Sequence, residues 1–233
     1  MRVETIIVGA GKGKRFGEIQ PKQFCLLWGK PVLSWTIERF EECKLVDKII
    51  LVLPPGMKEH AKKVVLSSFN YRKIKTTIEG GKHRGSSVFQ GLQVIDEDTD
   101  IVLVHDGVRP LILPHLIEKL IYETKENGAV TLGIPIKETV KKTDKKGLVI
   151  KTLDRRNLYS IQTPQGFKKD LIWQAYKMAS QSGKWASDDA ALVERLGNKV
   201  KIILGDERNI KITTSFDLKL AETLLKQSLV VSE

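Results

Sequence analysis

The sequence is poor in the residues that build disulfide frameworks and structural metal sites. Its 233 residues include two cysteines and four histidines. Cys25 and Cys43 lack CxxC or metal-ligand spacing, and no histidine pair has the H-E-x-x-H arrangement of zinc enzymes. We therefore expect both cysteines to be reduced, semi-buried packing residues, and the sequence gives little support for a zinc site.

Long apolar runs are also lacking. No segment approaches the roughly 18 to 20 apolar residues that a membrane-spanning helix needs. The first residues lead directly into a strand-like segment, without the basic head, apolar centre and cleavage site of a signal peptide. We therefore predict a cytoplasmic protein that does not associate with membranes.

Aromatic residues make up 6% of the chain and show no spacing typical of a base-stacking platform. The net charge of +11 would suit nucleic-acid binding, but the lysines are interspersed with acids along most predicted helices. We therefore expect no nucleic-acid partner. Small anionic substrates would account for the part of the positive charge that is clustered.

Apolar strand-like runs alternate with helical patterns along the chain. Strands are predicted at residues 5–8, 48–53, 75–79, 101–104, 129–134 and 199–204. Helices are predicted from Pro31, over 57–69 and 84–95, from Pro114, over 168–180, after an N-cap at Ser187, and over 216–226. The alternation predicts an α/β fold with a Rossmann-like, doubly wound, mostly parallel sheet. Without repeats or linkers, residues 1–233 are expected to form a single domain.

The alternation is interrupted at residues 136–158. Two short strand-like runs there flank Thr143-Asp144-Lys145-Lys146-Gly147, a turn sequence that predicts a β-hairpin. This inserted arm has little apolar surface of its own, so it would be only marginally stable alone. It either packs against something else, such as a second subunit, or extends into solvent.

A glycine-rich, cationic loop follows the first predicted strand, in the sequence GAGKGKRFGEIQPKQF. Gly9, Gly11 and Gly13 allow close backbone approach to a ligand, and Arg15 and Lys22 are among its four cations. Neither the Walker A spacing nor the dinucleotide G-x-G-x-x-G spacing is present. The loop suits a polyphosphate; the alternative is a flexible turn with solvated lysines.

Two further polar segments follow predicted strands. Gly80-Gly81 comes after the third strand, and His105-Asp106 follows the strand 101–104. Because the carboxyl ends of parallel strands meet at one edge of the sheet, these segments and the glycine-rich loop are expected to converge on one site. Asp106 could meet Mg²⁺ or a sugar hydroxyl, or it could form a salt bridge with Arg109. His105 is expected to be structural.

Other polar segments give weaker signals. Arg84 and Ser87 lie on the first turn of the helix after Gly80-Gly81, on one face. Arg155 and Thr163 follow the arm, and an arginine fork suits phosphate oxygens. Lys211 follows the last strand. Each could instead be a solvated surface residue.

Taken in order, these segments resemble those of the 2-C-methyl-D-erythritol 4-phosphate cytidylyltransferases. The similar stretches are GAGKGKRF, PKQF, EGGKHRGSSVFQGL, VHDGVRP, PIKETVKK, DRRNLYSIQTPQGF, SDDAALVE and GDERNIKIT. The first two are shared by many nucleotidyltransferases, whereas VHDGVRP, the TPQ stretch and NIKIT are more specific. The resemblance covers almost the whole chain.

The resemblance implies a role for each matching residue. Catalysis and phosphate contacts are implied for Arg15, Lys22, Arg155 and Lys211. Nucleotide contacts are implied for Ala10, Gly11, Gly13, Gly80, Gly81, Arg84 and Ser87. Acceptor contacts are implied for Asp106, Arg109, Thr139 and Thr163. Thr139 and Arg155 would reach the site from the other subunit of a homodimer, through the arm 136–158.

The implied reaction transfers CMP from CTP to 2-C-methyl-D-erythritol 4-phosphate and releases pyrophosphate. The implied cofactor is Mg²⁺, held mainly by the CTP phosphates, with Asp106 as a candidate protein ligand. The implied fold is that of the nucleotide-diphospho-sugar transferases. A ribitol 5-phosphate cytidylyltransferase is the nearest alternative, and a non-catalytic nucleotide- or RNA-binding protein is a more distant one.

Overall fold

A mixed seven-stranded sheet forms the centre of the protein, as a computed structural model describes it for residues 1–11, 21–67 and 69–230. The strands occur across the sheet in the order β11-β7-β10-β6-β1-β4-β5. Their bounds are β1 (Val3–Val8), β4 (Lys48–Leu53), β5 (Ile74–Glu79), β6 (Ile101–Asp106), β7 (Ala129–Pro135), β10 (Tyr159–Lys168) and β11 (Lys201–Leu204). All neighbours are parallel except β10, which is antiparallel to β6 and β7.

The central strands are apolar throughout because both faces of the sheet are covered. Along β4, Ile49 and Leu51 pack in the core on one face, and Ile50 and Val52 pack in the core on the other. This follows from the two-residue period of a strand, which turns alternate side chains to opposite faces. The predicted α/β fold with a doubly wound, mostly parallel sheet is confirmed.

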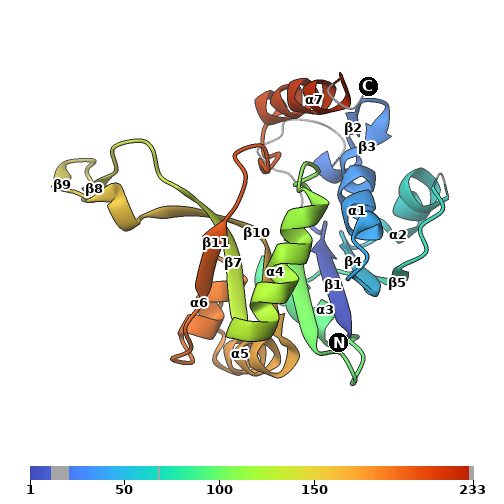
Figure 1. Ribbon diagram of the computed structural model, residues 1–233, viewed down its shortest axis with the longest axis horizontal. Coiled ribbons are helices and arrows are strands. Elements are labelled where there is room, and N and C mark those ends of the chain that lie inside the picture. Colours follow the sequence, from blue (N-terminus) through green and yellow to red (C-terminus); the bar gives the residue numbers. More distant parts are fainter. Residues whose placement is uncertain (12–20, 68, 231–233) are drawn as a thin grey trace.

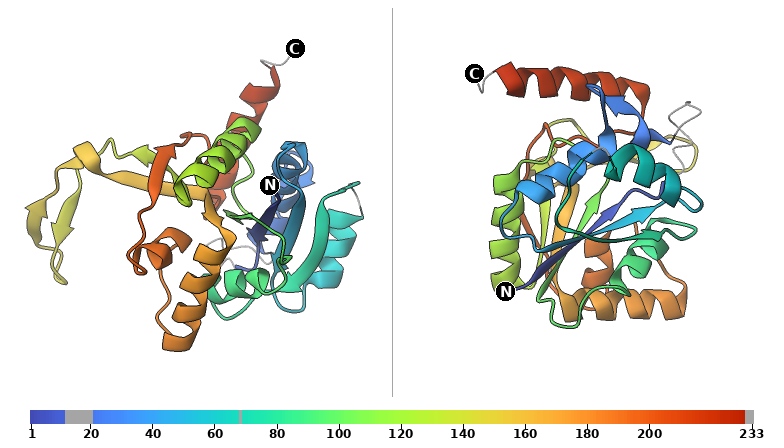
Figure 2. Two further views of the ribbon diagram at one scale, coloured as in Figure 1. Left: turned by 60° about the horizontal axis from the view of Figure 1, so that its bottom comes forward. Right: turned by 90° about the vertical axis from the view of Figure 1, so that its right-hand side faces the viewer.

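Helices cover the two faces, as Figures 1 and 2 show. Core side chains on one face come from α1 (Val32–Glu42) and α4 (Pro114–Asn127). Those on the other come from α3 (Arg84–Leu92), α5 (Lys169–Ser182) and α6 (Asp189–Glu194). The last helix, α7 (Ser215–Val230), packs on β2 (Leu26–Leu27). A two-residue strand, β3 (Lys30–Pro31), pairs with β2. No helix in the described part of the chain could span a membrane.

Three helical predictions need correction. Within the predicted helix 57–69, the described residues form the short α2 (Lys58–Ala61) and then η2 (Lys62–Leu66), a π-helical turn. The predicted helix 84–95 ends at Leu92. The N-cap of α6 is Asp188 and not Ser187, because the Asp188 carboxylate accepts a hydrogen bond from the Ala191 N–H at 3.3 Å.

β10, a ten-residue strand in the middle of the sheet, is not among the strands predicted from the sequence. Pro164 lies inside it, and a proline has no N–H for a sheet ladder. The register with β7 shifts between Gln162 and Gln165, so the proline occupies an irregular position in the pairing. The Thr-Pro-Gln segment, for which no strand was predicted, is therefore part of the sheet.

The arm leaves the body between β7 and β10. It contains the antiparallel pair β8 (Lys141–Thr143) and β9 (Val149–Thr152) and the short turn η3 (Arg155–Asn157). Figure 1 shows it projecting away from the sheet. Leu148, Val149 and Ile150 near its tip are 66%, 60% and 61% exposed, so these apolar side chains are uncovered in a single chain.

Candidate active site

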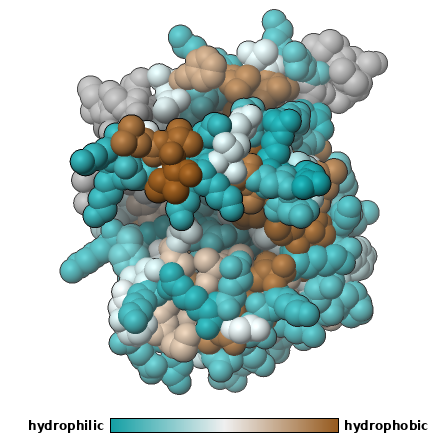
Figure 3. Space-filling view, turned by 90° about the vertical axis from the view of Figure 1, so that its left-hand side faces the viewer, coloured by the Kyte–Doolittle hydropathy of each residue, from teal (hydrophilic) through white to brown (hydrophobic). Residues whose placement is uncertain are grey.

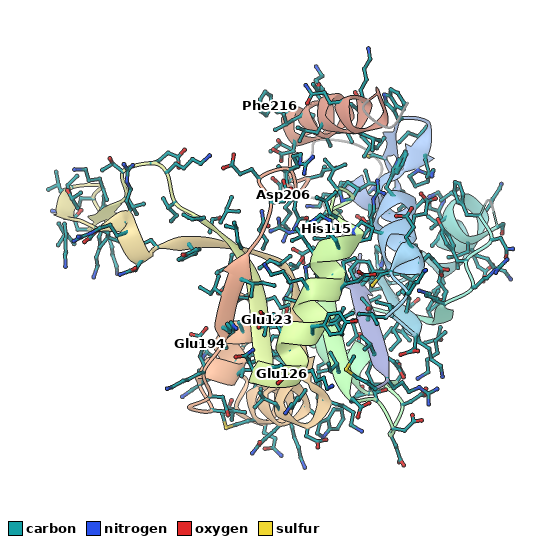
Figure 4. The ribbon with its side chains drawn as sticks, in the orientation of Figure 1. His115, Glu123, Glu126, Glu194, Asp206 and Phe216 are labelled. Atoms are coloured by element: carbon teal, nitrogen blue, oxygen red, sulfur yellow. The ribbon has the colours of Figure 1, made fainter. Side chains whose placement is uncertain are left out.

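A cavity of about 680 Å³ opens at the carboxyl ends of the parallel strands β1, β4, β5 and β6. Figure 4 marks this end of the sheet by Asp206, in the loop after β11, and the opposite end by Glu126 and Glu194. The residues that line the cavity are Val8, Gly9, Ala10, Gly11, Lys22, Gln23, Pro55, Gly80, Gly81, Lys82, His83, Arg84, Ser87, Asp106, Val108 and Lys211. The predicted convergence of the strand ends is therefore present.

The glycine pair after β5 is required by close packing. A Cβ atom on Gly80 would lie 2.3 Å from the Cβ of Ala10, and one on Gly81 would lie 2.4 Å from the Ser86 hydroxyl oxygen. The Gly81 N–H donates to the Ser87 hydroxyl at 3.0 Å, and that hydroxyl donates to the His83 carbonyl at 3.0 Å. The contacts hold this edge of the cavity close to the segment after β1.

Asp106, the last residue of β6, lies among three cations. Its carboxylate is 3.0 Å from Arg84 Nε, 2.8 Å from Lys211 Nζ and 3.6 Å from Arg109 Nε. Burial acts to raise the pKa of Asp106, but the three positive charges outweigh it and hold the pKa well below its usual range. The carboxylate is therefore ionised, and its salt bridges extend beyond the Arg109 pair considered from the sequence.

Arg84 is held from the other side by Asp189, a residue for which the sequence predicts no role. Its guanidinium donates to both carboxylate oxygens of Asp189, at 2.9 and 2.8 Å, and the Tyr176 hydroxyl donates to the same carboxylate. Burial lowers the pKa of Arg84, but Asp189 and Asp106 outweigh burial and raise it well above its ordinary value. Arg84 thus stays charged and oriented.

Thr163 and His105 form a buried support beneath Asp106. The Asp106 N–H donates to the Thr163 hydroxyl at 3.0 Å. His105 Nε2 faces the Arg109 carbonyl at 3.2 Å, and a carbonyl only accepts, so the ring proton of neutral His105 lies on Nε2. Nδ1 then accepts from the Thr163 hydroxyl at 3.1 Å. Burial lowers the pKa of His105 to about 3, so the imidazole is neutral.

These contacts give Thr163 a supporting position. Its hydroxyl hydrogen is directed at His105, and direct contact with an acceptor substrate stays a prediction. The expectation that His105 is structural agrees with its complete burial and neutral state.

Lys211 is brought to the cavity by the loop after β11. Asn209, for which the sequence predicts no role, is fully buried and donates from Nδ2 to the Thr163 carbonyl at 2.9 Å. Arg109 donates to the Asn209 carbonyl at 2.7 Å. The loop is thereby tied to β6 and β10, and Lys211 reaches Asp106 from it.

Of the glycine-rich loop, Gly9, Ala10, Gly11 and Lys22 line the cavity. Lys22 opens the turn η1 (Lys22–Phe24). Gly13 and Arg15 lie outside the described residues, so their predicted roles stay predictions.

The structure does not bring Thr139 and Arg155 to the cavity of the same chain. Both are exposed on the arm, and the Arg155 guanidinium donates to the Lys137 carbonyl. Their predicted contact with a substrate therefore requires a second chain or a different position of the arm.

The donor set around the cavity suits phosphate oxygens better than a bare metal ion. Asp106 is the only acid among the described residues that line the cavity. No group of three or more His, Cys, Asp or Glu side chains able to hold a metal occurs in the described ranges. Mg²⁺ commonly uses one carboxylate together with substrate phosphates, and this arrangement is compatible with Asp106.

Comparison with known proteins agrees with this geometry. The family described as 2-C-methyl-D-erythritol 4-phosphate cytidylyltransferase matches residues 3–227. The enzyme of that name from Alkaliphilus oremlandii is 44% identical over 97% of this chain and 95% of its own length, and that from Caldanaerobacter subterraneus is 40% identical over 97% of this chain and 100% of its own.

Solved structures give the same result. The 4-diphosphocytidyl-2C-methyl-D-erythritol synthase of Anaerococcus prevotii superposes with a TM-score of 0.85 at 34% identity, covering 97% of this chain and 96% of its own. The cytidylyltransferase of Thermus thermophilus superposes with a TM-score of 0.80 at 30% identity, covering 97% of this chain and 100% of its own. The chain therefore belongs to the 2-C-methyl-D-erythritol 4-phosphate cytidylyltransferase family of the isoprenoid pathway and is a CTP-dependent cytidylyltransferase.

Proposed function

We propose that the cavity binds CTP and transfers its CMP group to 2-C-methyl-D-erythritol 4-phosphate. The observation that carries this proposal is the composition of the cavity wall, which contains four cations, Lys22, Lys82, Arg84 and Lys211, and one carboxylate, Asp106. Such a wall attracts a polyphosphate and a second phosphorylated substrate. The carboxylate holds Arg84 and Lys211 in place before either arrives.

The nucleoside half of CTP would lie against the edge formed by Gly80, Gly81 and Ser87. The absence of side chains on the glycines lets a base approach the backbone, and a wider residue at Gly80 would collide with Ala10. Ala10, Gly11 and, outside the described residues, Gly13 would contact the phosphates.

The reaction itself is an in-line displacement at the α-phosphorus. An acceptor phosphate oxygen forms the new P–O bond, and the bond to pyrophosphate breaks. A phosphate nucleophile is already ionised near neutral pH, so the reaction needs no general base. The neutral, buried His105 agrees with this, because it is directed at Arg109 and Thr163 instead of the cavity.

Catalysis would then consist of positioning and charge stabilisation. Lys22 and Arg15 would offset the charge that develops on the α-phosphate and on the leaving pyrophosphate. Lys211 and Arg109 would orient the acceptor. Bound Mg²⁺, held mainly by the phosphates with Asp106 as the candidate protein ligand, would neutralise part of their charge.

The acceptor half of the site would be completed by a second chain. Thr139 and Arg155 lie on the exposed arm, and Figure 3 shows brown apolar patches on the side of the molecule from which the arm projects. Exposed apolar surface of this kind often marks a protein interface. We propose a homodimer of single-domain chains in which the arm 136–158 of each subunit presents Thr139 and Arg155 to the partner's cavity.

The test is pyrophosphate release from CTP and Mg²⁺, with methylerythritol phosphate and ribitol 5-phosphate offered separately as acceptors. We expect release with methylerythritol phosphate only. Release with ribitol phosphate only would keep the chemistry and change the acceptor. No release with either, together with RNA binding that weakens steeply with salt, would favour the binding-protein alternative.

A further inference from the structure

The side chain of Gln23 joins the two ends of the glycine-rich loop. Gln23 lies in η1 directly after Lys22 and is 1% exposed. Its Nε2 donates to the Gly9 carbonyl at 2.6 Å and lies 3.3 Å from the Gly11 carbonyl oxygen. Both partners can only accept, so the carboxamide nitrogen must face the loop.

These bonds fix the direction of a peptide group in the cavity wall. In a planar trans peptide the C=O and the N–H point in opposite directions, so holding the Gly9 carbonyl also aims the Ala10 N–H. The Gly9 N–H donates to the Val52 carbonyl at 2.8 Å, and Ala10 packs on Gly80. The start of the loop is thus held by β4, by the glycine pair and by Gln23.

The other end of the connection is equally well anchored. Phe24 is 1% exposed and its ring meets that of His60 edge-on, with the centroids 4.9 Å apart. Gln23 and Phe24 therefore fix the backbone of η1, and Lys22 extends from this turn into the cavity wall.

We propose that Gln23 is a positioning residue for CMP transfer. Its carboxamide couples Lys22 to the Gly9–Gly11 backbone, so that the lysine ammonium and the loop N–H groups face the same phosphates. A displacement of about 1 Å at a reacting centre can cost on the order of 100-fold in rate, so a coupling of this kind affects turnover directly. The inference rests on the proposed function.

The experiment compares the full-length protein with Gln23→Met, which keeps the length of the side chain and removes both contacts. We expect kcat for pyrophosphate release to fall about 10- to 100-fold and CTP to bind more weakly by calorimetry, whereas KM for the acceptor is unchanged. Gln23→Asn keeps the amide but withdraws it by one methylene, so it should give the same split if Gln23→Met does not fold.

The matched control is Thr124→Val in α4. It removes a buried hydrogen bond, from the Thr124 hydroxyl to the Leu120 carbonyl at 2.7 Å, far from the loop. We expect it to lower Tm and leave kcat and CTP affinity unchanged. If Gln23→Met lowers Tm in the same way and changes neither kcat nor CTP affinity, the positioning role is wrong.

Failure of the proposed function gives a different result. In that case the wild-type protein releases no pyrophosphate with either acceptor, whatever residue stands at position 23. Calorimetry with CTP still tests the positioning role of Gln23 in that case. Weaker CTP binding to Gln23→Met than to wild type supports this role. Equal binding to the two proteins, or no binding to either, overturns it.

Discussion

Charged side chains around Asp106 in the cavity are paired and partly or fully buried, whereas those on the arm are exposed to solvent. The Asp106 side chain is 8% exposed and lies beside three cations from α3, the segment after β6 and the loop after β11. On the arm, Arg156 is 85% exposed and is paired with Asp154, two residues away. Exposed pairs of that kind contribute little, whereas a buried array is costly to disturb.

The difference indicates what each region does. Charges in the cavity are oriented before a ligand arrives, which is what electrostatic catalysis requires. On the arm, Arg155 and Arg156 bond to other residues of the arm, and the apolar Leu148, Val149 and Ile150 are exposed. The cavity is therefore preorganised for an anionic ligand, which we propose is CTP, and the arm has exposed apolar surface that a second chain would cover in the proposed dimer.

The largest expected effect is a loss of folding stability when the prepared array, formed by Asp189, Arg84 and Asp106, loses one charge. Asp189→Asn leaves the half-buried Arg84 with one of its two carboxylate partners, and breaking a pair whose acid is fully buried costs up to about 3–5 kcal/mol. Urea denaturation measures the loss. The control is Asp98→Asn, whose partner Arg2 is on the surface and whose side chain is 65% exposed, so stability should hardly change. Equal losses in the two variants would contradict a prepared array.

The next effect concerns turnover. Lys22→Ala should lower kcat at least about 100-fold, the scale of losing one oriented transition-state donor. The measurement is steady-state pyrophosphate release. Lys58→Ala removes a lysine from α2 outside the cavity lining and should leave kcat unchanged. Near-normal turnover in Lys22→Ala would remove that lysine from the mechanism.

A substitution in the arm should change KM for the acceptor more than KM for CTP. Arg155→Ala should raise KM for the acceptor about 10- to 100-fold, the worth of a hydrogen bond to a charged group, with a smaller change for CTP. Arg156→Ala, one position along the same turn, is the matched control and should change neither. A larger effect on CTP would place Arg155 in the nucleotide half.

Mixing the Lys22→Ala and Arg155→Ala chains, assayed with the acceptor well below its KM so that both are impaired, tests where the arm acts. If Arg155 serves the partner's cavity, a dimer of one Lys22→Ala chain and one Arg155→Ala chain contains one intact site. Random exchange of subunits should then restore about a quarter of the wild-type activity. If each arm serves its own cavity, mixing restores nothing and the proposed exchange of residues is wrong.

Part of the fold and of the candidate site could be predicted from the sequence. The strands and their convergence at one edge were predictable, because apolar runs and glycine-rich turns are local signals. β10 was not, because Pro164 within it is a local signal for a turn, and only pairing with β6 and β7 makes the segment a strand. Tertiary pairing overrode local preference there.

Supporting residues were the hardest to find. Asp189 meets Arg84 across 105 positions of sequence, so no spacing rule connects them. Gln23 is only 14 positions from Gly9 in the sequence. The sequence Pro-Lys-Gln nevertheless does not indicate that the glutamine carboxamide points toward the Gly9 carbonyl. Residues that would contact a phosphate have a characteristic chemistry, whereas residues that hold them are defined by packing.

Per pH unit, the smallest effect is a pH dependence of stability that comes from the buried support of Asp106 and not from the arm. The pKa of buried His105 is lowered from 6.5 to about 3, so between these values the unfolded chain binds a proton that the folded chain does not. Stability from this group is present above pH 6.5 and is lost as pH falls, by up to about 1.4 kcal/mol per pH unit. Urea midpoints between about pH 6.5 and 4.5 should therefore fall less steeply in His105→Asn than in wild type. Parallel slopes would mean that His105 takes up a proton in the folded protein.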